Sequence, residues 1–361
     1  MSKETFKSDD NKDFKIITRH DRRILRDLLP LRKPLSVFIE PTNLCNFRCV
    51  PCVQGDEKTR NDLKPFGHMN LDLFKKIISE IKTWEGDKLR LLRLAVLGEP
   101  FLHPQMTDMI RIAKDADIAG RVDTFSNGSL LTEEISRKIV DYGLDYIRFS
   151  IYSVLNERHK ETTKSNCDIR TIFNNIHTLR MIRDSKNKSN PYIFVKMFDT
   201  YGEENDIFFQ MYKDVADEVD LEKVHNATKY SGNDLIKAYY KNERYEQATR
   251  AEYQKGLHNH IACPRPFMAM VISSMGDVVM CTHDAPRATK IGDVKVNTLE
   301  EIWNSRELFE FRKMHLLGRK HENLLCRNCD WYKLFPIEDN VDGVPVEKFA
   351  PRETNGFDSL H

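Results

Sequence analysis

The feature that most constrains the fold is a regular alternation of short apolar runs with longer amphipathic segments, beginning at Leu35. This alternation is typical of βα units, in which the strands form a parallel sheet and helices cover it. The strand candidates are 35–40, 91–98, 121–127, 146–152, 192–198 and 218–225. The helix candidates are 71–84, 104–116, 132–143, 169–184 and 204–216. Six such units predict either a partial barrel or a doubly wound sheet.

Polar motifs directly follow the first three strand candidates. A loop with three cysteines follows 35–40, the sequence LGEP (Leu97–Pro100) follows the second candidate, and SNG (Ser126–Gly128) follows the third. In both folds the loops after the carboxyl ends of parallel strands meet on one side of the sheet. We therefore expect these three motifs to lie together on one rim.

The charge balance and the hydropathy of the sequence limit the classes of binding partner to expect. Lys and Arg (56) nearly balance Asp and Glu (55), so no overall field attracts nucleic acid or anionic membrane. No apolar run approaches the roughly 20 residues that span a bilayer, and the first residues lack the apolar core of a secretion signal. We expect a cytoplasmic protein whose partners include neither nucleic acid nor a membrane.

The eight cysteines fall into groups of three, four and one. In a reducing compartment such grouping suggests metal ligation more than disulfides. Three thiolates on a short loop can bind three irons of a [4Fe-4S] cluster and leave the fourth iron open to a small molecule. The alternative is a zinc site completed by a histidine such as His68 or His103. The three cysteines of this loop are Cys45, Cys49 and Cys52.

The group of four suggests a second metal site. A turn at 274–277 would join two strands, and a helix over 298–314 would return the chain to the last two cysteines. Four thiolates make a closed site, for which spacing alone leaves zinc and iron-sulfur as equal alternatives. These cysteines are Cys263, Cys281, Cys326 and Cys329.

Together these motifs resemble the radical S-adenosylmethionine (SAM) superfamily. The resemblance is carried by C-x-x-x-C-x-x-C after the first strand and by GEP after the second, in a chain of six βα units. It implies a partial (β/α)6 TIM-like barrel and a cluster whose open iron binds SAM. It also implies reductive cleavage of SAM, abstraction of a hydrogen atom from substrate carbon, and an electron donor of flavodoxin or ferredoxin type.

The resemblance also implies SAM contacts. Glu99 of GEP would meet the methionine amino group, Ser126 and Asn127 the ribose, and Ser150 the methionine carboxylate. The alternatives are a helix-start acid for Glu99 and ordinary polar residues at strand ends for the other three. The family often has an aromatic residue before the third cysteine, whereas Pro51 stands here, so the adenine contact is not assigned.

The second cysteine group resembles the SPASM extension of radical SAM enzymes, through G-D-V-x-x-C, I-G-D-V, LEEIW and a terminal C-x-x-C. Four cysteines match the single-cluster variants found among aminocyclitol and amino-sugar dehydrogenases, epimerases and dehydratases. We therefore expect two [4Fe-4S] clusters, one that binds SAM and one auxiliary. The expected organisation is an arm (1–34), the partial barrel (35–235), a small cysteine-rich SPASM-type domain (236–332) and a tail (333–361).

Three residues are candidates for catalysis. Lys196 on the fifth strand could neutralise a carboxylate, or could lie solvated outside the barrel. His225, at the end of the sixth strand candidate, could act as a base. Cys167, near the start of a helix, could return a hydrogen atom to a substrate radical, although a lone cysteine is usually a small buried apolar residue. The remaining histidines near the second cysteine group are equally consistent with a surface position: His258, His260 and His283.

The main functional hypothesis is a radical SAM enzyme that oxidises, epimerises or dehydrates a small polar substrate such as a sugar, amino sugar or cyclitol. The second is a maturase for a ribosomal peptide. Such enzymes often carry a leader-recognition domain of about 80 residues, and only 34 residues precede the first strand candidate, which weighs against this hypothesis. The third is a zinc-stabilised binding protein without catalysis.

Overall fold

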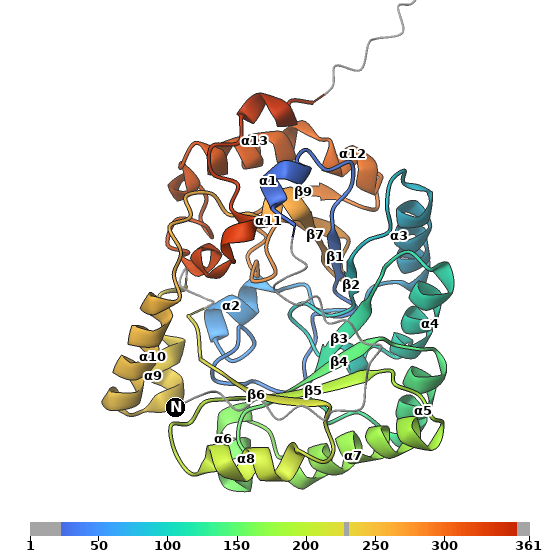
Figure 1. Ribbon diagram of the computed structural model, residues 1–361, viewed down its shortest axis with the longest axis vertical. Coiled ribbons are helices and arrows are strands. Elements are labelled where there is room, and N and C mark those ends of the chain that lie inside the picture. The colour runs from blue at the N-terminus through green and yellow to red at the C-terminus, as the bar shows by residue number, and fades with distance from the viewer. Residues whose placement is uncertain (1–22, 227–230, 352–361) are drawn as a thin grey trace, which may run out of the picture.

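The computed structural model describes residues 23–226 and 231–351. It contains one sheet of nine strands in the order β6-β5-β4-β3-β2-β1-β7-β8-β9. Helices α3, α4, α5 and α7 follow the outer side of the curved sheet (Figure 1). The strands from β1 to β6 succeed one another in chain order, as in a barrel, whereas a doubly wound sheet reverses its direction.

The six strand candidates are confirmed, and each pairs in parallel with its neighbour. Two end three or more residues earlier than expected, because the sequences LAVLG and KVH leave the ladder as loops. The strands are β1 (Ser36–Ile39), β2 (Leu91–Arg93), β3 (Val122–Ser126), β4 (Tyr146–Ile151), β5 (Tyr192–Phe198) and β6 (Glu218–Glu222). His225 therefore lies in the loop after β6 and not on the strand.

The five helix candidates are also confirmed, with side-chain caps at several of their starts, such as Asn70 and Thr132. They are α3 (Leu71–Thr83), α4 (Met106–Ala116), α5 (Glu133–Asp141), α7 (Ile169–Ser185) and α8 (Glu204–Tyr212). Helices that the sequence pattern did not predict are α2 (Glu57–Asp62), α6 (Asn156–Thr163), α9 (Leu235–Tyr240), α10 (Glu243–Lys255) and α11 (Arg265–Met268). Throughout the described residues, no helix is both long and apolar enough to cross a bilayer.

The two faces of the sheet differ in chemistry. On β4, Ile147, Phe149 and Ile151 are fully buried and belong to the same core as Ile172 and Ile176 of α7. The alternate residues of the strand are only partly buried and point to the inner face. The outer face thus carries the core, and the inner face is left for polar side chains.

The second cysteine group begins on strands that continue the same sheet. β7 (Ala269–Ile272) pairs in parallel with β1, and β8 (Asp277–Val279) and β9 (Lys290–Asp293) follow in antiparallel order. The expected turn between β7 and β8 is present, with Gly276 at φ +91°. The expected single helix over 298–314 is two helices, α12 (Leu299–Trp303) and α13 (Arg306–Leu316), because Ser305 caps a new start.

The arm and the tail pack against each other. Leu25 and Leu29, in and after α1 (Leu25–Leu28), share a small apolar cluster with Val341, Val344 and Phe349 of the tail. Of the expected arm (1–34), the structure describes residues 23–34, which include α1. The positions of the domain boundaries remain a prediction, since the sheet runs across the one at 235.

Candidate active site

The first cysteine loop is held from both sides by backbone hydrogen bonds. The N–H of Cys52 donates to the carbonyl of Cys49 at 3.0 Å, which gives the loop a tight turn. From outside, the carbonyl oxygen of Thr162 at the end of α6 accepts from Val50 N–H at 2.8 Å. These contacts fix the loop that carries all three thiols.

Burial makes the three thiols unfavourable to ionise without a metal. It raises the pKa of Cys45 to about 12, and the nearby Glu99 carboxylate raises it further. The pKa of Cys49 also lies well above its ordinary value, because of burial and then because of Cys52 and Cys45. The thiols therefore lie close to one another, and bound iron would have to replace their protons. A buried set of three thiols on one loop fits a [4Fe-4S] cluster with one open iron.

No group of three or more His, Cys, Asp or Glu side chains within 23–226 and 231–351 converges tightly enough to bind a single metal ion. A [4Fe-4S] cluster does not need such convergence, because each thiolate binds a different iron. His103 is engaged elsewhere: its Nε2 pairs with Met69 O at 2.8 Å, and its Nδ1 accepts from Gln105 N–H at 3.0 Å. His68 is exposed and packs against the His103 ring.

The GEP loop lies directly against the cysteine loop. A Cβ on Gly98 would stand 2.1 Å from Thr42 O and 2.6 Å from Leu44 O, so only glycine allows this approach. The next residue, Glu99, donates its N–H to Leu44 O at 2.8 Å. Glu99 is thereby held beside Cys45.

The Glu99 carboxylate brings together three of the predicted SAM contacts. It accepts hydrogen bonds from Ser126 Oγ at 2.9 Å and from the backbone N–H groups of Asn127 at 2.7 Å and Phe101 at 3.2 Å. Burial raises the pKa of Glu99 to about 7. The side-chain amide of Asn127 donates to Asn46 on the cysteine loop at 2.8 Å. The motifs after β1, β2 and β3 thus form one site.

Lys196 lies inside the barrel and not in solvent. It is only 3% exposed, and its Nζ forms an ion pair with Glu222 at 3.0 Å. Glu222 also accepts from Arg148 NH1 at 2.9 Å. Ser150 pairs with Lys196 in the β4–β5 register, so both side chains face the inner side. Burial raises the pKa of Cys52, and the charge of Lys196 partly offsets this rise, so the cation would favour an ionised thiol at this position.

His225 lies between the two halves of the site. The carboxylate of Glu222, on the barrel side, and that of Asp330, beside the second cysteine group, are both near enough to raise the pKa of His225. Its ring centroid is 5.4 Å from that of Tyr253, whose hydroxyl donates to Asp330 at 2.7 Å. Burial lowers the pKa of His225, and its buried Nδ1 has no hydrogen-bond partner among the residues that the structure describes.

Cys167 lies apart from these residues. It precedes Asp168, the cap of α7, and its sulfur faces the Asp168 carbonyl at 3.7 Å. Its side chain packs against the main apolar core. In the described part of the chain, none of its contacts reaches Lys196 or His225.

The four downstream cysteines form a second buried set. Burial raises the pKa of Cys326, and the other three thiols of the group raise it further. Lys320 Nζ donates to the carbonyls of Cys326 at 3.0 Å and Cys329 at 2.8 Å. Such a set can bind all four irons of a closed cluster.

The histidines near this set are not equivalent. His283 is near Cys281, and burial lowers its pKa to about 4. Its ring packs against Trp331 at 5.2 Å. His260 pairs with Phe335 O at 2.8 Å and its ring lies 5.6 Å from that of His258. The surface alternative therefore does not hold for His283 or for the buried His260.

Sequence reasoning missed several polar residues of the inner face. Glu222 and Arg148 lie on predicted strands, and their period-two spacing could have identified them as inward residues. Tyr152 is the last residue of the strand candidate 146–152, and Asp330 directly follows Cys329, but neither belongs to a motif. Only the folded chain brings these four residues into contact with the predicted ones.

Two family models match the chain. The model of the radical SAM superfamily matches residues 39–195, and the SPASM iron-sulfur cluster-binding domain matches residues 263–330. Together they cover more than half of the sequence. Their limits contain both cysteine groups, and the second begins at Cys263.

Some curated relatives match this chain over a minor part of their length, and others over most of it. The tungsten-containing aldehyde ferredoxin oxidoreductase cofactor-modifying protein of Pyrococcus furiosus is 31% identical over 115 residues, 32% of this chain and 30% of that protein. The S-adenosyl-L-methionine-dependent 2-deoxy-scyllo-inosamine dehydrogenase of Niallia circulans is 18% identical over 294 residues, 81% of this chain and 92% of that protein. In the first of these and two further relatives, the match spans only 30% to 37% of their length.

Solved structures resemble this chain over both its radical SAM part and its SPASM part. BtrN in complex with AdoMet and 2-DOIA aligns with a TM-score of 0.54 at 16% identity, over 82% of this chain and 92% of that one. Streptococcus suis SuiB bound to precursor peptide SuiA aligns with a TM-score of 0.60 at 13% identity, over 85% and 73%. At these identities the likeness concerns the fold, and it confirms the expected partial barrel followed by a SPASM domain. The chain belongs to the radical SAM superfamily of enzymes, carries a SPASM domain, and has SAM and two [4Fe-4S] clusters as its cofactors.

Proposed function

We propose that this enzyme abstracts a hydrogen atom from a C–H bond of a small polar substrate, a sugar, amino sugar or cyclitol. The observation that carries the proposal is the polar inner face of the barrel, where Lys196, Glu222 and His225 lie between the two cysteine groups. The SAM-binding cluster is assigned to Cys45, Cys49 and Cys52. The auxiliary cluster is assigned to Cys263, Cys281, Cys326 and Cys329.

The SAM-binding residues follow from charge. Glu99 is a buried carboxylate with three hydrogen bonds, and the ammonium of the methionine moiety would supply its counter-charge. Ser150 and Lys196 face the same side and would hold the methionine carboxylate. The cluster that Cys45, Cys49 and Cys52 would hold, together with SAM, would supply the chemistry of hydrogen abstraction, with the electron coming from a flavodoxin- or ferredoxin-type donor.

The inner face suits a hydroxylated or aminated substrate. With Lys196 paired to the methionine carboxylate, the Glu222 carboxylate, which forms an ion pair with Lys196 here, would accept hydrogen bonds from hydroxyl or amino groups of the substrate. His225 is kept neutral by its lowered pKa and can accept the hydroxyl proton during oxidation. Two relatives are named for such substrates, the 2-deoxy-scyllo-inosamine dehydrogenase and the dTDP-4-amino-4,6-dideoxy-D-glucose ammonia-lyase of Streptomyces venezuelae.

Among the outcomes, oxidation has the most structural support. His225 lies near both Glu222 and Asp330, next to the auxiliary cysteines, so a proton and an electron can leave the substrate on the same side. For epimerisation the candidate hydrogen donor is Cys167, which packs against the main apolar core. Oxidation to a ketone is therefore the proposed reaction.

A second candidate is modification of a peptide. It is favoured by an open groove of about 830 Å³ between α6 and α9, which reaches Val50 on the cysteine loop. Tyr239, Tyr240 and Tyr245 line the groove and offer contacts for an extended chain. A peptide substrate would occupy this groove and place one residue in the barrel.

Anaerobic reconstitution tests the function. We expect about eight irons per chain and formation of 5′-deoxyadenosine on addition of dithionite and SAM. A substrate deuterated beside its hydroxyl or amine should transfer deuterium to 5′-deoxyadenosine, and assays with aminocyclitols, amino sugars and peptides would separate the two candidates. Reconstituted protein that contains the irons but never forms 5′-deoxyadenosine would contradict the proposal.

A further inference from the structure

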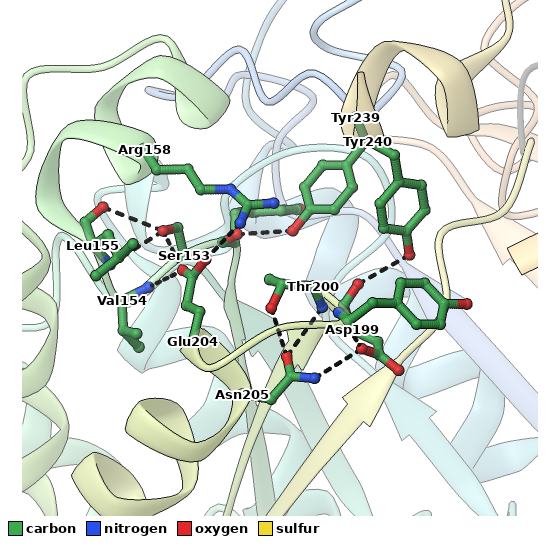
Figure 2. Close-up of polar contacts among 12 residues, drawn as sticks. Ser153, Val154, Leu155, Arg158, Asp199, Thr200, Glu204, Asn205, Tyr239 and Tyr240 are labelled. Atoms are coloured by element: carbon green, nitrogen blue, oxygen red, sulfur yellow. Dashed lines mark hydrogen bonds and ion pairs between the residues drawn. The ribbon is translucent and has the colours of Figure 1, made fainter. Parts of the chain in front are cut away.

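Two cationic side chains beside the four downstream cysteines have no carboxylate partner among the described residues. They are Lys320, which begins the short 3-10 helix η4 (Lys320–Glu322), and Arg265, the first residue of α11. The usual arrangement in this protein is an ion pair, as between Arg158 of α6 and the buried Glu204 of α8 at 2.6 Å (Figure 2). A cation that leaves water needs such a balancing charge or several hydrogen bonds.

Lys320 is tied to the turn that carries the last two cysteines. Its Nζ donates to the carbonyl oxygens of Cys326 at 3.0 Å, Arg327 at 3.2 Å and Cys329 at 2.8 Å. An ammonium has three N–H groups, so all of its donors are directed at this one turn. The carbonyl oxygens satisfy the donors and leave the positive charge in place beside the thiols.

Arg265 extends from the auxiliary part to the barrel. It follows Cys263 by two residues, and its guanidinium carbon lies 5.2 Å from the ring centroid of Trp331 and 5.5 Å from that of Phe335. The same carbon is 5.7 Å from the ring centroid of Phe38, which alternates with two core residues of β1 and so faces the inner side of the sheet. The guanidinium is therefore surrounded by aromatic rings at the contact of the two parts.

This environment sets Arg265 apart from the other buried cations of the described chain. Lys196 and Arg183 have carboxylate partners, and Arg312 donates to two carbonyl oxygens. Arg265 is 8% exposed, and within the described residues its guanidinium forms neither an ion pair nor a hydrogen bond. Ring faces attract a cation but do not neutralise it. The anion that would balance its charge is the group bound by the neighbouring cysteines.

We propose that Lys320 and Arg265 are positioning residues whose charges raise the reduction potential of the auxiliary cluster. This rests on the assignment of the four downstream cysteines to that cluster in the proposed function. A [4Fe-4S] cluster with four thiolate ligands is an anion, and reduction adds one further negative charge. A cation held nearby, away from water, therefore stabilises the reduced form more than the oxidised form.

The direction of this effect suits the proposed oxidation. When an alcohol carbon becomes a ketone carbon there, a hydrogen atom is abstracted, His225 takes the hydroxyl proton, and one electron remains to be accepted by the auxiliary cluster. A higher potential favours acceptance of that electron. Because Arg265 lies between Phe38 of the inner face and Trp331 beside Cys329, its charge stands on the path from the barrel to the cluster.

The test measures the potentials of both clusters by EPR-monitored titration of the reconstituted full chain. The auxiliary cluster is the one whose signal stays the same when SAM is added. In Lys320→Gln and in Arg265→Gln we expect its potential to shift to more negative values, with unchanged iron content, because an amide keeps N–H donors and loses the charge. Lys320→Arg and Arg265→Lys keep the charge and should retain most of the wild-type potential.

Arg158→Gln is the matched control, since it removes a partly buried cation that has its own carboxylate, and it should leave the auxiliary potential unchanged. Wild-type potentials in both glutamine variants would overturn the proposal. A shift as large in Lys320→Arg as in Lys320→Gln would overturn the role of charge. Should Lys320→Gln bind less iron, Arg265→Gln decides, because Arg265 donates no hydrogen bond to the cysteine turn in the described structure.

The failure of this proposal is distinguishable from the failure of the proposed function. Shifted potentials support the role of the two cations whether or not a cyclitol or amino sugar is oxidised. Absence of substrate oxidation beside shifted potentials would count against the proposed reaction alone. A wild-type chain that binds iron only at the first cysteine group would overturn the assignment of the auxiliary cluster and this proposal with it.

Discussion

The Glu99 carboxylate is 3% exposed and accepts three hydrogen bonds, and no cation of the described chain forms an ion pair with it. Burial raises its pKa to about 7, so near neutral pH it is divided between its charged and neutral forms. A bound ammonium would favour the charged form. A single side chain can thus link SAM affinity to pH.

Glu99→Gln should weaken SAM binding roughly 10- to 150-fold, because a hydrogen bond to a charged group contributes about 1.5–3 kcal/mol. The amide keeps the shape and removes the charge. Equilibrium binding of SAM to anaerobic protein measures the effect. Glu133→Gln, at an exposed position of α5, is the control and should leave the affinity unchanged. Equal affinity in Glu99→Gln and the wild type would remove Glu99 from the SAM site.

The affinity for SAM should also fall as the pH is lowered from 8 to 6. Protonation of Glu99 below its pKa of about 7 removes the charge that pairs with the ammonium. The dependence should be absent in Glu99→Gln, which has no proton to gain. Binding isotherms of both proteins at the two pH values make the comparison, and a fall of the same size in both would assign it to another group.

At the level of elements, the site depends on loops that touch across the ends of strands. The GEP loop follows β2 and meets the cysteine loop that follows β1, and Gly98 stands at the contact. Helix α6 supports the same cysteine loop from outside through Thr162. Each strand can be predicted from its own sequence. The loops contact one another only because parallel pairing places the ends of neighbouring strands, where the loops begin, side by side.

Gly98→Ala should destabilise the protein by about 1–3 kcal/mol and lower the iron content of the first site, because its Cβ would overlap two carbonyl oxygens. Urea unfolding and iron analysis are the measurements. Gly202→Ala is the matched control: its nearest neighbour, Thr200 O, is 4.0 Å away. Normal stability and full iron content in Gly98→Ala would mean that the two loops do not meet as described.

At the scale of the whole molecule, the described parts of the arm and of the tail pack together against the auxiliary part. Leu25 and Leu29 of the arm pack with Val341 and Phe349 of the tail, and Phe349 stacks edge-on against Phe267 at 5.1 Å. Trp303 of α12 donates to Leu31 O at 3.0 Å and adds a polar contact to this packing. The two halves of the enzyme therefore share both a sheet and a closing apolar cluster.

Phe349→Ala should lower the free energy of unfolding by about 3–5 kcal/mol, since the ring is buried in this cluster. Ile337→Ala is the control on the same tail, because Ile337 is 61% exposed and should have little effect. Both changes are measured by urea unfolding. A loss below about 1 kcal/mol in Phe349→Ala would show that the tail is not part of the cooperative fold.

The sequence by itself determined the elements and the positions of the two cysteine groups, whereas iron-sulfur chemistry at the second group followed only from its resemblance to the SPASM extension. Strands and helices follow from the local period of apolar residues, and a cluster site whose ligands lie on one loop follows from their spacing. Both signals are contained in short windows of the chain. This is why the six strands, the main helices and the two cysteine groups could be predicted, while α6, with no apolar stripe in NERHKETT, could not.

Only the tertiary structure decided which distant residues meet. Parallel pairing brings Arg148, Lys196 and Glu222 to one face, although 74 positions separate Arg148 from Glu222. The pairing of β7 with β1 joins the SPASM part to the barrel sheet, and Glu204 reaches back to the segment after β4. Such contacts depend on strand order, on register and on which loops pack together. These are set by burial of the whole core, so no local pattern contains them.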